Sequence, residues 1–574
     1  MALSQRVAIY LAAAFSIGVS STLWAAEPTS SEEAKSQLVS QAETLRKEGK
    51  KVYKPREEKP EVEVEKEKPV LPEEEGPTFL VRKIKLEGNR ASARVLEAML
   101  EAFQNQKMNL RQLKAVSQMI TNYYRFNGYV TSRAYIPPQK VEEGVVQIKV
   151  IEGTVGHVYV EGNKYFKGSI YADSMHFGKD KVFRVQDLES SLYFLNSKPD
   201  RKAKAYLIAG EEPGTSDIIL KAEDKNPFHM SYEFHNGGTK FTLRPRHVMR
   251  IEHNNISGRG DTLNVTNSYA EQAAFDGVVL DYNLPMESKR TRFSLETSYI
   301  ESKLVRQFKP SHISGAYGSM IPALTRTFIR EPTFVAEGYV GLEVKDSKTM
   351  TEELKTSFDR MRVLRLGPRF TFQSETGKTW LSTDLHLGLP RFMGGSERND
   401  SSASRLHSGG DFMYFTGSFV RINRLPNENS LLLRVNGQWS HETLTSVEQM
   451  RLGGLYTVRG YPEADFSGDY GYNLSAEFQM PAPIFHKDVR VPHTNKRWHD
   501  ALHLVAFVDV GKTFLRHKGL PINPRSKFLL GTGVGVRFDL DRSCSMQVDM
   551  GWPIGDVSAE NNQKQIYMSF RVGF

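Results

Sequence analysis

The sequence predicts a transmembrane β-barrel of about sixteen antiparallel strands, preceded by two small α/β units and by an N-terminal helix with a linker. Three observations lead to this fold class. The chain opens with a secretory signal, and no later segment is apolar and long enough to span a membrane as a helix. Residues 226–574 consist of short alternating stretches rich in aromatic residues. Because a chain in lipid must satisfy its backbone internally, such a protein crosses the membrane as a closed barrel.

Residues 1–26 have the pattern of a signal peptide. Arg6 precedes an apolar run from Val7 to Val19, and small residues follow in "STLWAAEP". The run is shorter than the roughly 20 residues that a spanning helix needs. We therefore expect cleavage near Ala25 or Ala26, with an uncleaved anchor as the competing interpretation.

Residues 27–53 predict one polar helix, and residues 54–77 predict an extended linker. Ser30 and Glu33 fit a capping box, and a thin apolar stripe follows them. The next residues, "KPREEKPEVEVEKEKPVLPEEEGP", combine prolines with dense mixed charge, which forbids a packed core. At roughly 3.1 Å per residue such a linker reaches tens of ångströms.

Residues 78–153 and 154–225 form the two predicted α/β units. Each opens with a strand, continues through helical patterns and closes with two strands. The opening strands end alike, as "IKLEGN" in the first unit and "VYVEGN" in the second. This repeat favours tandem copies of one domain over two unrelated domains.

Residues 226–574 alternate between an apolar and a polar face, as barrel strands do. In Phe528–Leu540 one face holds Phe528, Leu530, Val534 and Val536, while the other is rich in glycine and ends in Arg537 and Asp539. A soluble β-sandwich also alternates, but the signal peptide and an aromatic last residue favour a membrane barrel. The final segment presents one apolar face made of Ile566, Met568, Phe570, Val572 and Phe574.

Composition argues against several other classes of protein. The net charge of +9 is spread along the chain, so nucleic-acid binding is not expected. Cys544 is the only cysteine, and no Cys and His cluster has metal-ligand spacing. The motifs G-x-S-x-G, H-E-x-x-H and the P-loop are absent from the sequence. We therefore expect no enzyme activity, no cofactor and no metal site.

One glycine-rich stretch, "GGLYTVRGYPEADFSGD", carries an arginine at its centre, Arg459. A buried arginine is costly unless it is paired, and its planar fork suits a carboxylate. In "LHLVAFVDVGKTF" the alternation turns Asp509 inward from an otherwise apolar strand. Asp509 is thus a candidate partner, and the alternative is a solvated surface loop with an unrelated aspartate.

The order of these regions resembles the TpsB transporters of two-partner secretion, which belong to the wider superfamily of POTRA domains joined to a barrel. Three stretches carry the resemblance, which covers essentially the whole mature chain. "GYVTSRAYIPPQKVEEGVVQIKVIEG" is similar to the closing half of the family's first POTRA domain. "VRGY" resembles the signature at the tip of the sixth extracellular loop, and "FVDVG" resembles the inward-facing motif that this tip contacts. The corresponding residues are Val458, Arg459, Gly460 and Tyr461 for the tip, and Phe507, Asp509 and Gly511 for its partner.

The resemblance implies export of a secreted partner, a TpsA-type exoprotein, by a monomer in the outer membrane of a Gram-negative bacterium. The POTRA domains would stand in the periplasm and recognise the unfolded partner, which could be an adhesin, a cytolysin or a contact-dependent toxin. Residues 27–53 match the family's plug helix by position, with a loose spacer as the alternative. An outer-membrane assembly factor of the same superfamily is the alternative function.

The end of the chain resembles the signal read by the outer-membrane assembly machinery. Phe570, Val572 and Phe574 carry this pattern, and they would also face the lipids. A passive porin is a different class, and it would lack the periplasmic domains.

Overall fold

The computed structural model describes two compact units, one ending at Pro227 and the other running from Phe228 to Phe574. The predicted signal peptide, the helix predicted over 27–53 and most of the linker lie outside the described residues. None of the helices in the described parts is long and apolar enough to cross a membrane. The described residues are 62–64, 77–91, 93–175, 177–178, 181–286, 290–305, 309–310, 312–352, 354–486, 488–516, 526–540, 544–555 and 564–574.

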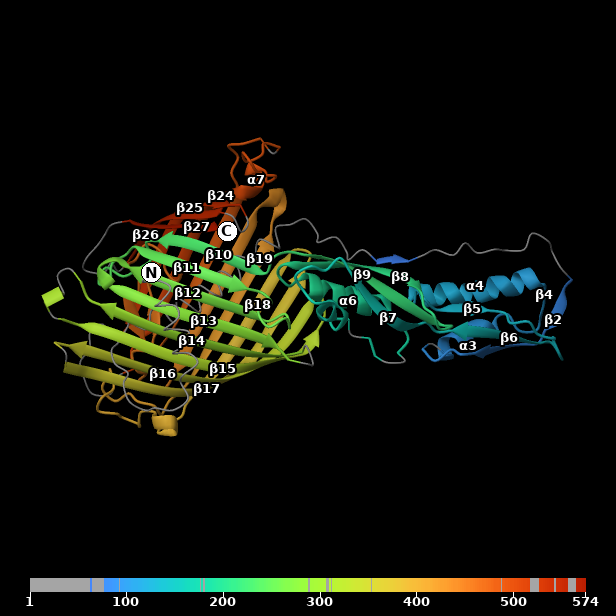
Figure 1. Ribbon diagram of the computed structural model, residues 1–574, viewed down its shortest axis with the longest axis horizontal. Helices are drawn as coiled ribbons and strands as arrows, with labels where there is room; N and C mark the ends of the chain where they lie inside the picture. Colours follow the sequence, from blue (N-terminus) through green and yellow to red (C-terminus); the bar gives the residue numbers. More distant parts are fainter. Residues whose placement is uncertain are drawn as a thin grey trace. The chain divides into compact units, whose positions relative to one another are not determined.

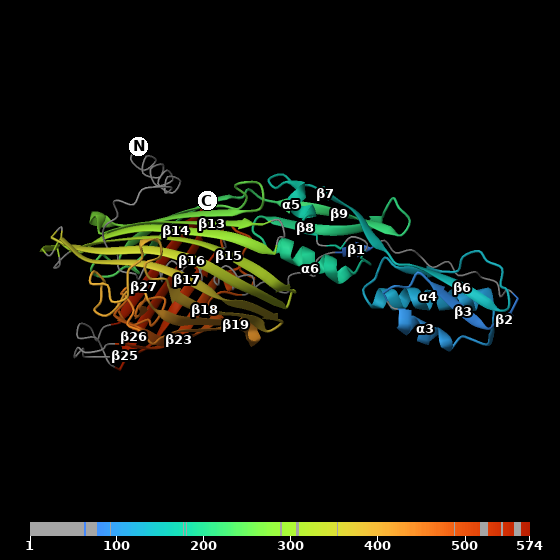
Figure 2. The same ribbon diagram turned by 90° about the horizontal axis from the view of Figure 1, so that it is seen from below.

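The first unit begins with an α/β domain whose helices lie beside its sheet (Figure 2). Strand β6 is central, pairing in parallel with β3 and antiparallel with β5. Leu113 and Ile120 of α4 pack into one core with Val146 and Ile148 of β6, which buries the apolar face of each element. The elements are β2 (Phe79–Val81), β3 (Lys83–Glu87), α3 (Ala93–Glu101), β4 (Gln106–Met108), α4 (Leu110–Phe126), β5 (Arg133–Tyr135) and β6 (Val145–Ile151).

A second α/β domain follows and repeats the pairing of the first. Strand β9 lies between β7, which is parallel to it, and β8, which is antiparallel. The shared Glu-Gly-Asn sequence has a common cause, because Gly88 and Gly162 both have positive φ, at 87° and 82°. The elements are β7 (Thr154–Glu161), α5 (Gly168–Ala172), α6 (Val185–Asn196), β8 (Arg201–Ala209) and β9 (Thr215–Asp224).

The linker region contributes a strand that the sequence did not predict. Strand β1 (Val62–Val64) pairs in parallel with β8 and extends the second sheet to four strands. Charge and prolines around these residues predict only an extended chain. The open edge of β8 supplies the backbone partners that convert the extended chain into a strand.

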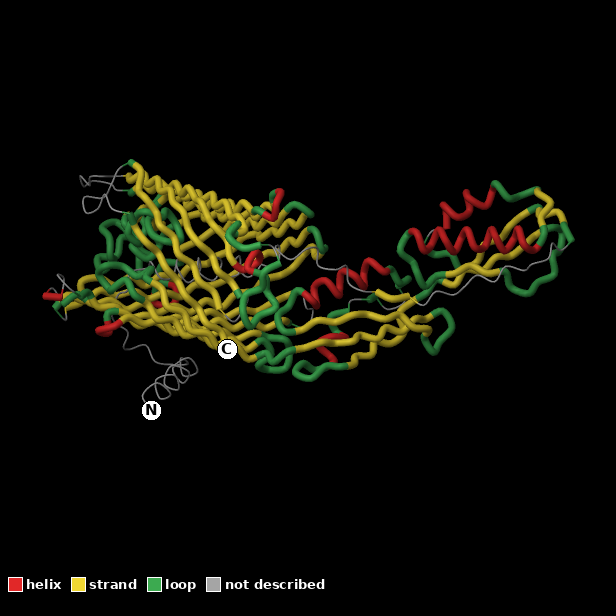
Figure 3. Tube along the Cα trace, turned by 90° about the horizontal axis from the view of Figure 1, so that it is seen from above, coloured by secondary structure: helices red, strands yellow, loops and turns green. Residues whose placement is uncertain are grey.

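The second unit is a closed barrel of sixteen antiparallel strands, which confirms the predicted fold class (Figures 1 and 3). It closes where β10 pairs with β27. The strands are β10 (Phe228–His235), β11 (Arg246–His253), β12 (Thr262–Ala270), β13 (Phe275–Pro285), β14 (Thr291–Lys303), β15 (Ser314–Arg330), β16 (Phe334–Thr351), β17 (Leu354–Ser374), β18 (Gly377–Gly388), β19 (Met413–Arg424), β20 (Ser430–Ser440), β23 (Tyr470–Pro481), β24 (Leu502–Phe514), β25 (Ser526–Asp539), β26 (Cys544–Ile554) and β27 (Gln565–Gly573).

We call the end of the barrel that carries Phe228 the near rim and the opposite end the far rim. Because consecutive strands are antiparallel, β20 ends and β23 begins at the far rim, whereas β23 ends and β24 begins at the near rim. Four short helices lie in the connections described: η1 (Glu271–Ala273), η3 (Phe392–Gly394), η4 (Pro426–Glu428) and α7 (Trp498–Ala501).

The alternation predicted for the barrel strands agrees with the burial of their side chains. On β24, Val508 is 47% exposed on the outside, whereas its neighbour Asp509 is completely buried. On β25, Phe528 and Val534 are exposed while Leu529 is buried. One face of each strand therefore points outward and the other lines the lumen.

Candidate functional site

The connection between β20 and β23 folds back into the barrel, and we call residues 441–469 the lumen loop. Within it, β21 (Met450–Leu452) and β22 (Phe466–Gly468) form a short antiparallel pair. The residues between these strands form the tip. Arg459, at the centre of the tip, is only 1% exposed.

Arg459 is bound by Asp509 of β24, the partner that alternation suggested. Its Nε and Nη2 atoms donate to the two carboxylate oxygens at 2.7 and 3.0 Å. The backbone N–H of Arg459 donates to Asp509 Oδ2 at 3.1 Å. This bidentate, charge-assisted contact fixes both the side chain and the backbone of the tip.

Two further acids bind the same guanidinium, and the sequence reasoning missed both. Arg459 Nη1 donates to Glu477 of β23 at 2.7 Å and lies 3.3 Å from Asp549 of β26. Both acids occupy inward positions of alternating strands. The alternation that turned Asp509 towards the lumen therefore places them on the lumen face as well. Asp509 was selected because its strand is otherwise apolar and because it lies in the FVDVG motif, whereas no motif marks Glu477 or Asp549.

Two arginines of the wall complete this cluster. Arg537 Nη2 donates to Asp549 Oδ2 at 3.0 Å, and Arg434 Nη2 lies 3.8 Å from Glu477. Including Arg459, the cluster holds three bases and three acids and is therefore neutral. The guanidinium of Arg459 also lies 3.4 Å from the centre of the Phe507 ring, which excludes water from one of its faces.

The other residues of the tip motif dock on neighbouring strands. Val458 is buried in one apolar cluster with Leu452, Tyr461 and Leu529. The Tyr461 hydroxyl lies 3.1 and 3.2 Å from the backbone carbonyls of Leu530 and Ile554. These contacts spread the tip over β25 and β26.

Tyr567 of β27 holds the tip from a further strand. Its hydroxyl donates to the Tyr461 carbonyl at 2.6 Å and accepts from the Gly460 N–H at 3.1 Å. The Phe507–Gly511 motif of β24 lies directly against the lumen loop. A Cβ added at Gly511 would meet the side chains of Leu452 and Val458 at 2.9 Å. The structure thus brings together all the residues named for the two short motifs. The C-terminal residues lie apart from this site, because Phe570 and Phe574 are exposed.

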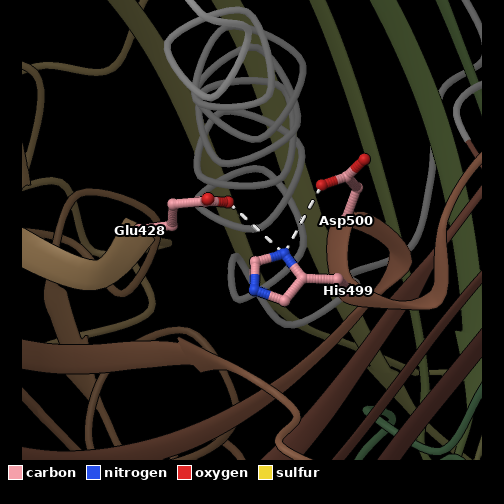
Figure 4. Close-up of side chains that lie close together, drawn as sticks. All are labelled: Glu428, His499 and Asp500. Carbon is pink, nitrogen blue, oxygen red and sulfur yellow. Dashed lines mark ion pairs between the residues drawn. The ribbon is translucent and has the colours of Figure 1, made fainter. Parts of the chain in front are cut away.

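A second charged cluster lies at the near rim, between two turns (Figure 4). His499 Nδ1 lies 3.3 Å from Glu428 Oε2 and 3.6 Å from Asp500 Oδ1. These three side chains converge as metal ligands do. However, Arg497 donates to both oxygens of Asp500 at 2.9 and 3.0 Å, and this contact raises the pKa of Arg497. A cation would have to displace Arg497, so we describe the cluster as an ion-pair network.

Comparison with known families assigns both units. The family model described as haemolysin secretion/activation protein ShlB/FhaC/HecB matches residues 214–538. The chain belongs to this family. A second model, the ShlB-type POTRA domain, matches residues 79–153. The protein is therefore an outer-membrane transporter of the TpsB type, with a periplasmic POTRA domain over residues 79–153.

Individual relatives extend the match over most of this TpsB transporter. The heme/hemopexin transporter protein HuxB of Haemophilus influenzae strain 86-028NP is 24% identical over 487 residues, covering 83% of each chain. The outer membrane transporter CdiB of Dickeya dadantii strain 3937 is 24% identical over 506 residues, covering 87% of each chain. The solved structure of CdiB from Escherichia coli has the same fold, with a TM-score of 0.72 at 20% identity, covering 96% of this chain and 100% of that one.

Proposed function

We propose that this transporter exports an unfolded secreted partner protein of the TpsA type through its barrel, after its POTRA domains have bound the partner. In this proposal it works as a monomer in the outer membrane of a Gram-negative bacterium. The observation that carries the proposal is the lumen loop, whose tip is buried against the inner wall by ionic and hydrogen-bonded contacts. Such contacts can be exchanged for contacts to water, so the loop can occupy the pore at rest and leave it during transport.

The docking cluster suits a reversible obstruction. The desolvation of buried charges is costly, and this cost is recovered when water returns to them. Withdrawal of Arg459 would expose Glu477, Asp509 and Asp549 together with Arg434 and Arg537. A wall with charges of both signs is well hydrated, so an unfolded polar chain would slide along it without adhering.

Strand addition is the mode of partner binding that the POTRA domains support best. In this mode backbone hydrogen bonds supply affinity and neighbouring side chains supply selectivity. The outer edge of β8 is covered by β1, and the Ala134 N–H of β5 donates to Thr121 on α4. Within the sheets described, β3 and β7 each have a strand on one side only. An extended segment of the partner would add to one of these two edges.

The test is export in cells that also produce the candidate exoprotein. Arg459→Ala or Asp509→Ala removes the bidentate contact, and each is expected to reduce the partner protein in the medium while the barrel remains in the outer membrane. Arg391→Ala is the matched control, because Arg391 forms an exposed ion pair with Glu397 at the far rim. Normal secretion by both variants, at equal transporter levels, would show that the pairing has no role in export.

A further inference from the structure

We propose that the lumen loop has a second anchor, in which Glu448 is held by Lys345 and Tyr414 on a different part of the wall from the Arg459 cluster. These three are positioning residues, and their role rests on the proposed function of the loop as a removable obstruction. Lys345 lies on β16 and Tyr414 on β19, whereas the Arg459 cluster is built on β23–β26 and β20. In the strand order, β16 is the seventh strand and β26 the fifteenth of sixteen, whereas β19 and β20 are neighbours, so the two anchors occupy adjoining arcs of the wall.

The contacts of Glu448 are as enclosed as those of Arg459. Its side chain is 1% exposed, and both carboxylate oxygens accept from Lys345 Nζ, at 3.0 and 3.2 Å. The Tyr414 hydroxyl donates to Oε2 at 2.7 Å. A buried carboxylate with three charge-assisted or short hydrogen bonds is a strong point of attachment for a loop.

The charged residues of the wall around Lys345 favour the binding of an acid such as Glu448. Lys345 also lies 2.6 Å from Glu343, and the alternating ladder continues through Arg365 and Asp384 to Arg369. Over these five residues the wall alone has one more base than acids, and Glu448 places a negative charge against Lys345.

The wall at the first anchor has the opposite imbalance. Without the loop, Glu477, Asp509 and Asp549 outnumber Arg434 and Arg537 by one. Arg459 supplies the missing positive charge. The loop therefore presents an acid to Lys345 and a base to the acids of the first anchor, and this charge complementarity favours one arrangement of the loop.

Apolar contacts support the second anchor. Leu444 is completely buried with Met361, Val363 and Phe412, in the same cluster as Tyr414. Val447 packs against a separate apolar cluster that includes Phe275 of β13, Ile300 of β14 and Tyr317 of β15. The base of the loop thus has its own docking surface, distinct from that of the tip.

The experiment measures ion conductance of the purified full-length protein in planar bilayers, so that no partner protein is needed. Glu448→Gln keeps the shape of the side chain and removes its charge, and we expect openings to be on the order of tenfold more frequent. Arg459→Gln is expected to have a similar effect. Because the anchors share no residue, the two effects should multiply in the double variant. Glu397→Gln, which alters the exposed pair with Arg391, should leave the openings unchanged.

A double-variant cycle distinguishes anchoring from simple packing. Lys345→Met removes the ammonium that holds Glu448, so it should raise the openings by itself, and Glu448→Gln should add little in that background. Each barrel is first checked for its folded, heat-modifiable mobility on gels. The inference is overturned if Glu448→Gln opens no more than twice as often as the wild type, if its effect disappears in the Arg459→Gln background, or if Glu448→Gln acts as strongly in the Lys345→Met background as in the wild type.

The same variants then separate this inference from the proposed function. We expect export of the exoprotein to change in the variants whose conductance changes. If conductance responds as expected but export of every tested exoprotein stays at the wild-type level, the second anchor stands and the role of the loop in export fails.

Discussion

Arg459 shows how a charged residue can hold a loop inside a membrane barrel. Its guanidinium contacts Asp509, Glu477 and Asp549 and covers the ring of Phe507. Breaking one partner of a buried pair typically costs about 3–5 kcal/mol, because the remaining charge is left without compensation. The position of the tip therefore depends on a few side chains rather than on the whole loop.

At the residue scale, the close approach of the tip to β25 gives a sharp prediction. A Cβ added at Gly531 would lie 1.8 Å from the carbonyl oxygen of Arg459, so Gly531→Ala must displace the tip. We expect the conductance of the purified barrel to rise, for the same reason that we expect it to rise when an anchor is removed. Gly417→Ala on β19 is the control, since no atom lies within 4 Å of the added Cβ. Equal conductance of the two variants would contradict the close approach.

The residues of the site could be predicted only in part. Alternation identified Asp509 because it is the one acid in an apolar strand, and the family resemblance paired it with Arg459. Glu477 and Asp549 are equally buried, but alternation gives only the face of a residue and not its partner. Glu448 and Lys345 are 103 positions apart, and their contact depends on the path of the loop across the lumen.

At the element scale, the two α/β domains show what a sequence repeat can specify. The order of helices and strands was predictable because each domain alternates between short strand and helix patterns. The pairing of β1 with β8 was not predictable, since three residues in a charged linker carry little strand signal. That pairing protects a sheet edge, which otherwise invites association with other chains.

The repeated glycine gives a prediction at this scale. Gly162 has a φ of 82°, and a Cβ added there would lie 2.7 Å from the Ala222 carbonyl oxygen. Gly162→Ala should destabilise the second domain by about 1–2 kcal/mol or more, because a left-handed conformation is costly for other residues. We expect faster cleavage between β7 and β9 in limited proteolysis of the full chain. Gly168→Ala, with an added Cβ at an ordinary 3.6 Å from Val160, should be cleaved like the wild type.

At the scale of the whole molecule, the barrel was the most predictable feature and the interior of its lumen the least. Each strand can be recognised from the alternation of apolar and polar residues within it, so the approximate number of strands follows from the sequence. A loop that returns into the lumen has no such local pattern. Its position is decided by contacts with strands that lie far away in the sequence, as Tyr461 with β25 and β26 illustrates.

The closing residue of the barrel gives the last prediction. Phe574 is 75% exposed, and its backbone exchanges hydrogen bonds with Met230 at 2.8 and 3.3 Å. Deletion of Phe574 should lower the amount of protein in the outer membrane, as measured by immunoblotting of that fraction. Phe574→Ala keeps the backbone bonds and removes the ring, so a similar loss would assign the effect to recognition of the aromatic residue by the assembly machinery. Unchanged levels in both variants would count against a C-terminal signal.

The pairing of β10 with β27 has a consequence for biosynthesis. The barrel can close only after β27 has been translated, so a chain that ends early leaves β10 and its final strand with one unpaired edge each. Tyr567 lies on β27 and also holds the tip of the lumen loop. A chain that ends before β27 therefore cannot close the barrel and also lacks the Tyr567 contacts that hold the tip of the lumen loop.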